Sequence, residues 1–259
     1  MPEYRECLAH FLLLLWWVSH YKALTPLSLV ALWADASKTE EAKIPGTRDG
    51  HVYWLDATSV VTRGTNGAQT WLWPSMWRKT SRQLNPPSIQ TLSLRDITMT
   101  SRAVILDMGP LFLKLSYLTH TSVQIFRRNV WYTSVCGVDK KQRGFHVGLA
   151  LEFGEFVIAF LSNDMVFQPL WTESKEKLPQ SPPDVYTDYA DFLTAVATWI
   201  QKRASGQNTR NGIACQVVRE ANETWSGIGV YTVCELFFDA GLSPFLTEAE
   251  VFDSPSRTA

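Results

Sequence analysis

The feature that most constrains the fold is a series of short strand-like segments joined by tight turns in the middle of the chain. Apolar residues fill His51–Leu55, Phe145–Phe153 and Phe156–Leu161, which have the length and composition of β-strands. Gly154-Glu155 and Asn163-Asp164 reverse the chain between such segments. Connections this short cannot hold a crossover, so consecutive strands must be antiparallel neighbours. The pattern predicts a β-meander.

Helical periodicity follows the meander. Between residues 184 and 204, apolar side chains recur at spacings of three and four, the pattern of an amphipathic helix: Tyr186, Tyr189, Phe192, Leu193, Val196, Trp199 and Ile200. We expect two further helices near the start of the chain, over 6–22 and 26–35. The predicted fold class is α+β: a large, mainly antiparallel sheet, curved or partly closed, with the N-terminal helices and the 184–204 helix packed on it.

The 259 residues can form one domain, and we expect a single α+β domain over 1–259. Asn85-Pro86-Pro87-Ser88 has the composition of a linker. The alternative is therefore an internal boundary at 84–88. It would separate a helical and hairpin part (1–84) from a part with the meander, a helix and a second hairpin (89–253).

The second hairpin is expected from Ile213–Glu220 and Gly229–Phe238, which flank a polar loop. Pairing about the centre of that loop places Cys215 opposite Cys234. Directly opposed Cβ atoms lie about 4.5–5.5 Å apart, so the two thiols would be adjacent or joined by a disulfide.

The N-terminal segment is strongly apolar over Leu8–Val18 and again over Leu24–Trp33. A membrane-spanning helix needs about 20 apolar residues, and polar residues interrupt this stretch sooner. We expect a protein-packed helical hairpin; a signal peptide or anchor and an interfacial helix are the alternatives. Cleavage would leave three of the four cysteines, an odd number, so we expect a cytoplasmic protein with reduced thiols.

The charge balance bears on the partners. Lys and Arg number 24 against 25 Asp and Glu, and nucleic-acid binding usually shows a basic excess. We therefore expect no nucleic-acid partner and no membrane partner. The five histidines are dispersed, and CxxC, HExxH, GxGxxG and GxxxxGK[ST] patterns are absent from the sequence. The expectation is no metal and no cofactor.

Isolated polar residues in apolar strands are the catalytic candidates. His146 lies between Gly144 and Gly148, and glycine in a strand often marks a close approach by a ligand or another backbone. Asp56 and Asp107 end apolar segments, and His120 opens one. A side chain in such a place can act as a general acid or base. The structural alternatives are a satisfied or outward-facing histidine and a turn-forming aspartate.

Eleven tryptophans are the strongest compositional signal. Trp71 and Trp73 lie two residues apart, on one face of an expected strand, with Trp77 soon after and Trp54 on another strand. They are the candidate ligand-binding residues, because aromatic rings commonly line small-molecule pockets. An aromatic wall of the core is the alternative.

These observations favour a cofactor-independent protein whose aromatic-lined apolar pocket binds a hydrophobic small molecule. Such a protein could act as an isomerase or cyclase by substrate preorganisation. One alternative is a non-enzymatic interaction module, a toxin-neutralising or assembly subunit, with a protein partner or a second copy of the chain. The other is a membrane-associated or secreted protein anchored by residues 8–33.

Overall fold

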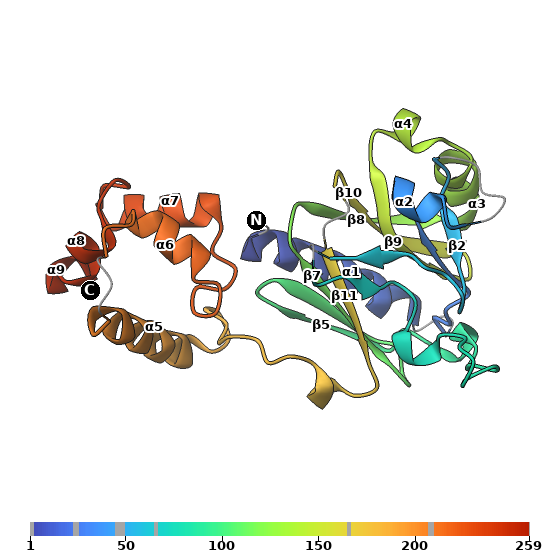
Figure 1. Cartoon of the computed structure of the whole chain (residues 1–259), viewed down its shortest axis with the longest axis horizontal. Helices are drawn as coiled ribbons and strands as arrows, with labels where there is room; N and C mark the ends of the chain where they lie inside the picture. Colours follow the sequence, from blue (N-terminus) through green and yellow to red (C-terminus); the bar gives the residue numbers. More distant parts are fainter. Residues whose placement is uncertain are drawn as a thin grey trace. The chain divides into compact units, whose positions relative to one another are not determined.

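The chain divides into two compact units (Figure 1). This computed structural model describes residues 3–22, 26–44, 50–64, 67–164, 167–206 and 210–258. The sheet unit comprises Ala9–Met99 and Ala103–Pro179, and the helical unit comprises Met1–Leu8, Thr100–Arg102 and Gln180–Ala259. The longest segment of the helical unit begins directly after Pro179, whereas the internal boundary suggested by the sequence lies at 84–88. Whether both units form one domain stays a prediction.

The sheet unit contains a five-stranded and a four-stranded sheet, and every pair whose register is defined is antiparallel. The strand orders are β2-β1-β9-β10-β8 and β11-β7-β6-β5, with β3 and β4 as a separate pair. The strands are β1 (Ala31–Ala34), β2 (Tyr53–Leu55), β3 (Thr62–Arg63), β4 (Thr70–Trp71), β5 (Asp96–Thr100), β6 (Ala103–Asp107), β7 (Phe112–Tyr117), β8 (Thr121–Arg127), β9 (His146–Phe153), β10 (Phe156–Ser162) and β11 (Phe167–Thr172).

The two sheets contact each other through apolar side chains. A Cβ on Gly148 of β9 would lie 2.3 Å from the ring of Phe167 on β11, so this position requires glycine. Seven of the eight residues of β9 are buried, as are six of the seven residues of β10. These strands form the centre of the core because they are covered on both faces.

Helical segments cover the sheet unit. On α1 (Tyr4–Lys22), the Trp17 ring packs against Phe153 and Phe156. Elsewhere α3 (Arg128–Val130) continues into a π-helical turn, η3 (Trp131–Cys136), whose buried side chains pack against β9 and β10. The remaining short helices of this unit are α2 (Lys38–Glu41), α4 (Lys140–Arg143), η1 (Ser75–Trp77), η2 (Ile89–Thr91) and η4 (Lys175–Lys177).

The helical unit has its own core. Trp225 packs edge-to-face against Phe192 and Trp199, and Val218 and Phe237 complete the buried cluster around it. The helices are α5 (Tyr189–Ala204), α6 (Ala214–Glu220), α7 (Val230–Asp239), α8 (Glu248–Phe252) and α9 (Pro255–Thr258).

The α+β class and the antiparallel pairing of β9 with β10 are therefore correct. The turn at Asn163-Asp164, by contrast, leads into β11, which pairs with β7 in the other sheet rather than with β10. Three further expectations are also wrong. The segment expected as a helix over 26–35 contains β1, because its backbone pairs with β9 and β2. The 184–204 helix packs on other helices of its unit rather than on a sheet. Within the described ranges, no helix has the length and hydropathy needed to cross a membrane.

The third correction concerns the hairpin expected over 213–238, which consists of α6 and α7 instead. Ala214 and Val218 are buried on α6, and Val233 and Phe237 are buried on α7. Each pair is spaced by four, so one face of each helix enters the core. Cys215 and Cys234, which were predicted to lie opposite each other on two strands, are free thiols on α6 and α7. The predicted strand register is therefore wrong.

Candidate functional site

A buried carboxylate at the start of α7 is the most distinctive polar group of the helical unit. Glu3 is 6% exposed. One of its oxygens accepts hydrogen bonds from the backbone N–H of Tyr231 (2.6 Å) and of Thr232 (3.2 Å). The other accepts one from the Thr232 hydroxyl (2.7 Å). The negative charge therefore lies where the unpaired N–H groups and the dipole of a helix stabilise an anion.

Two glycines before α7 make room for this arrangement. A Cβ on Gly229 would lie 2.5 Å from both Cγ and Oε1 of Glu3. Gly227 has φ +82°, a left-handed conformation that favours glycine, and its carbonyl accepts a hydrogen bond from Tyr4 N–H (3.0 Å). The segment 226–229 is thus shaped to receive the first described residues of the chain.

Further contacts hold the same segment in place. The rings of Tyr4 and Tyr186 stack at 4.5 Å, and Arg5 forms an ion pair with Glu235 on α7 (2.9 Å). Burial raises the pKa of the Cys7 thiol to about 12, so this cysteine stays protonated and unreactive at neutral pH. The site is a rigid carboxylate anchor rather than a thiol centre.

The two predicted catalytic aspartates have structural roles in turns. Asp56 accepts hydrogen bonds from Thr58 N–H (2.7 Å), from the Thr58 hydroxyl (2.7 Å) and from Ser59. Burial alone would raise the pKa of Asp56, but these hydrogen bonds outweigh it and lower the pKa. Asp107 accepts a hydrogen bond from Gly109 N–H (2.8 Å) after β6. Both are turn-forming side chains, the structural alternative.

The predicted histidines lie apart from each other. His146 is at the start of β9, with Nδ1 3.6 Å from the buried carboxylate of Asp35. That carboxylate also binds Arg143 (2.7 Å) and Val147 N–H (2.8 Å). His120 is exposed and lines a separate hollow of about 270 Å³. All four predicted catalytic residues belong to the sheet unit, whereas Glu3 belongs to the helical unit.

The four tryptophans do not form one wall. Trp73 and Trp77 are buried, and the indole N–H of Trp73 donates to the Trp77 carbonyl (3.0 Å). Trp54 is 65% exposed on β2. Trp71 is 37% exposed, and the Arg78 guanidinium covers its ring at 3.5 Å from the centroid. Two of the residues belong to the core, and two remain accessible in different places.

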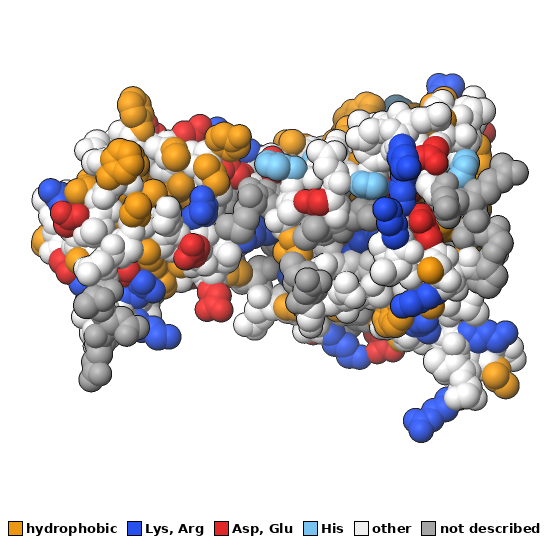
Figure 2. All heavy atoms as spheres, turned by 45° about the horizontal axis from the view of Figure 1, so that its top comes forward, with side chains coloured by type: hydrophobic (Ala, Val, Ile, Leu, Met, Phe, Trp, Pro, Cys, Tyr) orange, Lys and Arg blue, Asp and Glu red, His pale blue; other side chains and the backbone are white. Residues whose placement is uncertain are grey.

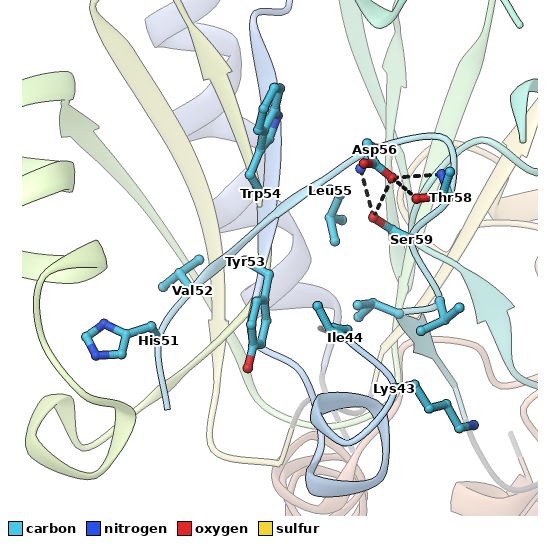
Figure 3. A pocket seen from close by; sticks show the side chains of 12 residues that line it. Lys43, Ile44, His51, Val52, Tyr53, Trp54, Leu55, Asp56, Thr58 and Ser59 are labelled. Carbon is cyan, nitrogen blue, oxygen red and sulfur yellow. Dashed lines mark hydrogen bonds between the residues drawn. The ribbon is translucent and has the colours of Figure 1, made fainter. Parts of the chain in front are cut away.

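Trp54 lies beside a hollow of about 530 Å³ in the sheet unit (Figure 3). Asp56, Thr58 and Ser59 form the hydrogen-bonded turn at one end, and His51 lies at the other. The His51 ring is fixed by a hydrogen bond between Nδ1 and the Cys136 carbonyl (3.1 Å). In the parts of the chain with described coordinates, no group of three or more His, Cys, Asp or Glu residues could hold a metal ion.

Sequence analysis missed Glu3, because one acid near the first residue carries no spacing signal. The usable signal was Gly227-Ile228-Gly229 ahead of an apolar segment. Paired glycines indicate a place where another part of the chain approaches the backbone closely. Their partner is more than 200 residues away in the sequence, so its identity could not be inferred.

Comparison with known proteins adds information on the fold. No protein-family model matches the sequence, and no curated protein matches it either. Solved structures do match. One is a formamidopyrimidine DNA glycosylase of Lactococcus lactis bound non-covalently to DNA containing an AP site: TM-score 0.55, 12% identity, 94% of this chain and 70% of that chain.

Two further structures give the same result. A complex of the LlFpg protein with a THF-DNA and an inhibitor has TM-score 0.56 and 12% identity, and the match covers 95% of this chain and 69% of that chain. MutM in complex with DNA containing carbocyclic 8-oxo-G has TM-score 0.52 and 10% identity, over 93% and 72%. At these identities the likeness is one of fold.

These neighbours overturn the function predicted from the sequence. They are DNA glycosylases in complexes with DNA, not isomerases or cyclases for hydrophobic small molecules. The predicted hydrophobic ligand and the predicted absence of a nucleic-acid partner are both contradicted, and neither alternative function is retained. The error came from using the net charge of the whole chain, whereas phosphate contacts depend on local groups, including backbone N–H.

Proposed function

We propose that this chain is a DNA-repair protein that binds duplex DNA at an abasic or oxidised nucleotide. The supporting observation is the extent of the fold match, which covers 94–95% of the chain and thus includes parts of both units. A likeness confined to the sheet unit would say little, because antiparallel sheets serve many functions. We propose the cytoplasm as its location, since four free thiols suit a reducing compartment.

The distribution of charge supports DNA binding once the units are separated. The sheet unit has 17 Lys and Arg against 13 Asp and Glu, a net charge of +4, whereas the helical unit has 7 against 12, a net charge of −5. The near-zero total therefore hides a basic unit. Figure 2 shows several Lys and Arg side chains on the visible face of the sheet unit. Such an excess favours contact with phosphates.

Glu3 is the proposed reactive group. Cleavage of a glycosidic bond builds positive charge on the sugar, and carboxylates stabilise that charge in glycoside-cleaving enzymes. The carboxylate of Glu3 is buried and held by three hydrogen bonds, so it needs little reorganisation as charge develops. We assign it the role of stabilising the sugar cation when an oxidised base is released.

Binding is tested with a short duplex that contains one tetrahydrofuran abasic analogue, compared with the intact duplex at the same salt concentration. We expect at least about tenfold tighter binding to the abasic duplex, a difference of about 1.4 kcal/mol. Equal affinity for the two duplexes would refute the proposal of damage recognition.

Chemistry is tested with duplexes that contain 8-oxoguanine, a formamidopyrimidine or an oxidised pyrimidine. We expect the wild-type chain to release one of these bases and Glu3→Gln to lose at least about 100-fold in rate, as for other groups that stabilise transition-state charge. Asp239→Asn is the matched control, because this carboxylate is exposed at the far end of α7 from Glu3. Binding without base release by the wild type would reject the assigned role of Glu3 and leave damage recognition standing.

A further inference from the structure

A polar hollow of about 400 Å³ belongs to the sheet unit, whereas Glu3 belongs to the helical unit. The hollow has no role in the chemistry assigned above. Helix α2 forms one side of it, and the β3–β4 hairpin forms the other. The described lining residues are Ser37, Thr39, Glu40, Lys43, Val60, Thr62, Gln69 and Trp71. Its volume is within the range of small-molecule sites, about 300–1,000 Å³.

The hairpin places an aromatic ring in this hollow. Thr62 pairs with Trp71 across the two strands, so their side chains share one face. The Arg78 guanidinium lies 3.5 Å from the centroid of the Trp71 ring, and its Nη1 is buried without a hydrogen-bond partner among the described residues. The Trp71 ring is nevertheless 37% exposed and lines the hollow, so part of its surface is accessible to a ligand there.

The acidic group in this hollow is already compensated. Glu40 accepts hydrogen bonds from Thr62 N–H (2.8 Å) and from Ser37 N–H (2.8 Å), and it lies 3.8 Å from the buried Arg63. The side chain of Lys43 is exposed at the same hollow. The hollow therefore combines a flat ring, hydroxyl and amide groups and an exposed cation, within a unit of net charge +4.

We propose that this hollow binds an unpaired nucleotide of single-stranded DNA, with its base stacked on Trp71 and its phosphate near Lys43. This inference rests on the proposed function for the identity of the nucleic acid. Base–aromatic stacking next to basic side chains is the usual mode of single-strand binding. Paired bases within a duplex have no free face for Trp71, so the site selects unpaired segments.

Neighbouring geometry favours an oligonucleotide over a single nucleotide. Lys43 and Val60 line both this hollow and the larger one beside Trp54. A strand with one base on Trp71 can therefore continue past Lys43 toward a second exposed indole. Neutral sugars also stack on tryptophan, but they gain nothing from the cation.

The test uses fluorescence anisotropy of a labelled oligothymidylate of about ten nucleotides, within the usual site size of about 4–16. Trp71→Ala should weaken binding by about 5- to 150-fold, the equivalent of about 1–3 kcal/mol for one stacked base. Trp71→Phe should retain affinity within about threefold, because it keeps an aromatic face. Trp16→Ala is the control, since this indole is 64% exposed on α1.

Four outcomes decide the inference. Unchanged affinity of Trp71→Ala, or equal losses for Trp71→Ala and Trp71→Phe, overturns it, and so does displacement by a neutral oligosaccharide as effectively as by unlabelled oligothymidylate. Loss with Trp71→Ala and retention with Trp71→Phe supports it. If that pattern occurs in a protein that does not prefer the abasic duplex, the inference holds and the proposed damage recognition fails, so the two are separable.

Discussion

Replacing Gly229 by alanine should destabilise the protein through Glu3 alone. Gly229 has φ −102° and ψ −162°, an extended conformation that alanine also adopts. The substitution therefore adds little backbone strain. The new Cβ would instead lie 2.5 Å from Cγ and Oε1 of Glu3, well inside van der Waals contact. Either the carboxylate or the start of α7 must move.

The expected magnitude follows from the hydrogen bonds that this movement breaks. Glu3 accepts three of them, two from backbone N–H and one from a hydroxyl. Hydrogen bonds to a charged group contribute about 1.5–3 kcal/mol each, and water restores part of that value at a displaced group. We expect a loss of about 3 kcal/mol in the free energy of unfolding. For a chain of this size that lowers Tm by about 6–12 °C.

A double-mutant cycle isolates the cause. Glu3→Ala alone should lose a similar amount, because it removes the same hydrogen bonds. In the Glu3→Ala background, Gly229→Ala should change stability by less than about 0.5 kcal/mol, since the clash is gone and alanine restricts the unfolded chain. Thermal unfolding followed by circular dichroism measures all four proteins. The reasoning is refuted if Gly229→Ala lowers the free energy of unfolding by about 3 kcal/mol in the Glu3→Ala background as well, or if it has no effect in the wild type. Either result would show that glycine is not required at position 229 because of its contact with Glu3.

Three further experiments test the placement of the tryptophans, of Asp35 and of the cysteines. Trp73→Ala should lower the free energy of unfolding by about 3–5 kcal/mol, because the ring is buried. Trp54→Ala removes an exposed ring and should change that free energy by less than about 0.5 kcal/mol. Urea unfolding compares the two variants, and equal losses would contradict the burial of Trp73 and the exposure of Trp54. Asp35→Asn should destabilise by about 3–5 kcal/mol, because its buried arginine partner at 2.7 Å loses its counter-charge; a neutral effect in the same assay would rule out that pairing. Iodoacetamide at pH 8 should alkylate the exposed Cys234 before Cys7, because burial raises the pKa of the Cys7 thiol to about 12. Peptide mass spectrometry measures the order of alkylation, and earlier modification of Cys7 would contradict its burial.

The β9–β10 hairpin was predictable because its information is local, whereas the placement of β11 beside β7 was not. Phe156–Leu161 was expected as a strand and is found as Phe156–Ser162, after the turn at Gly154-Glu155. Two short apolar segments joined by a two-residue turn leave one pairing, the antiparallel one. Nothing distant in the chain has to be known for that conclusion.

The apolar run before Trp33 was mispredicted for the opposite reason. A short continuous apolar segment suits a buried strand and a buried helix equally. The choice depends on partners elsewhere in the chain, here Leu55 on β2 and Leu151 on β9, both of which pair with Leu32. Thr25-Pro26, directly ahead of this segment, is a sequence pattern typical of a helix start, but tertiary pairing outweighed it.

The α6–α7 region shows how a correct pattern can support a wrong element. Cys215, Val217 and the residues opposite them satisfied a two-residue period, but Ala214 and Val218 satisfy a four-residue spacing equally well. The intervening loop should have decided between them. It is longer than the usual two to five residues of a hairpin loop. Gly227 and Gly229 at its end permit the close approach of another segment. That segment carries Glu3, whose identity the local sequence around the glycines does not reveal.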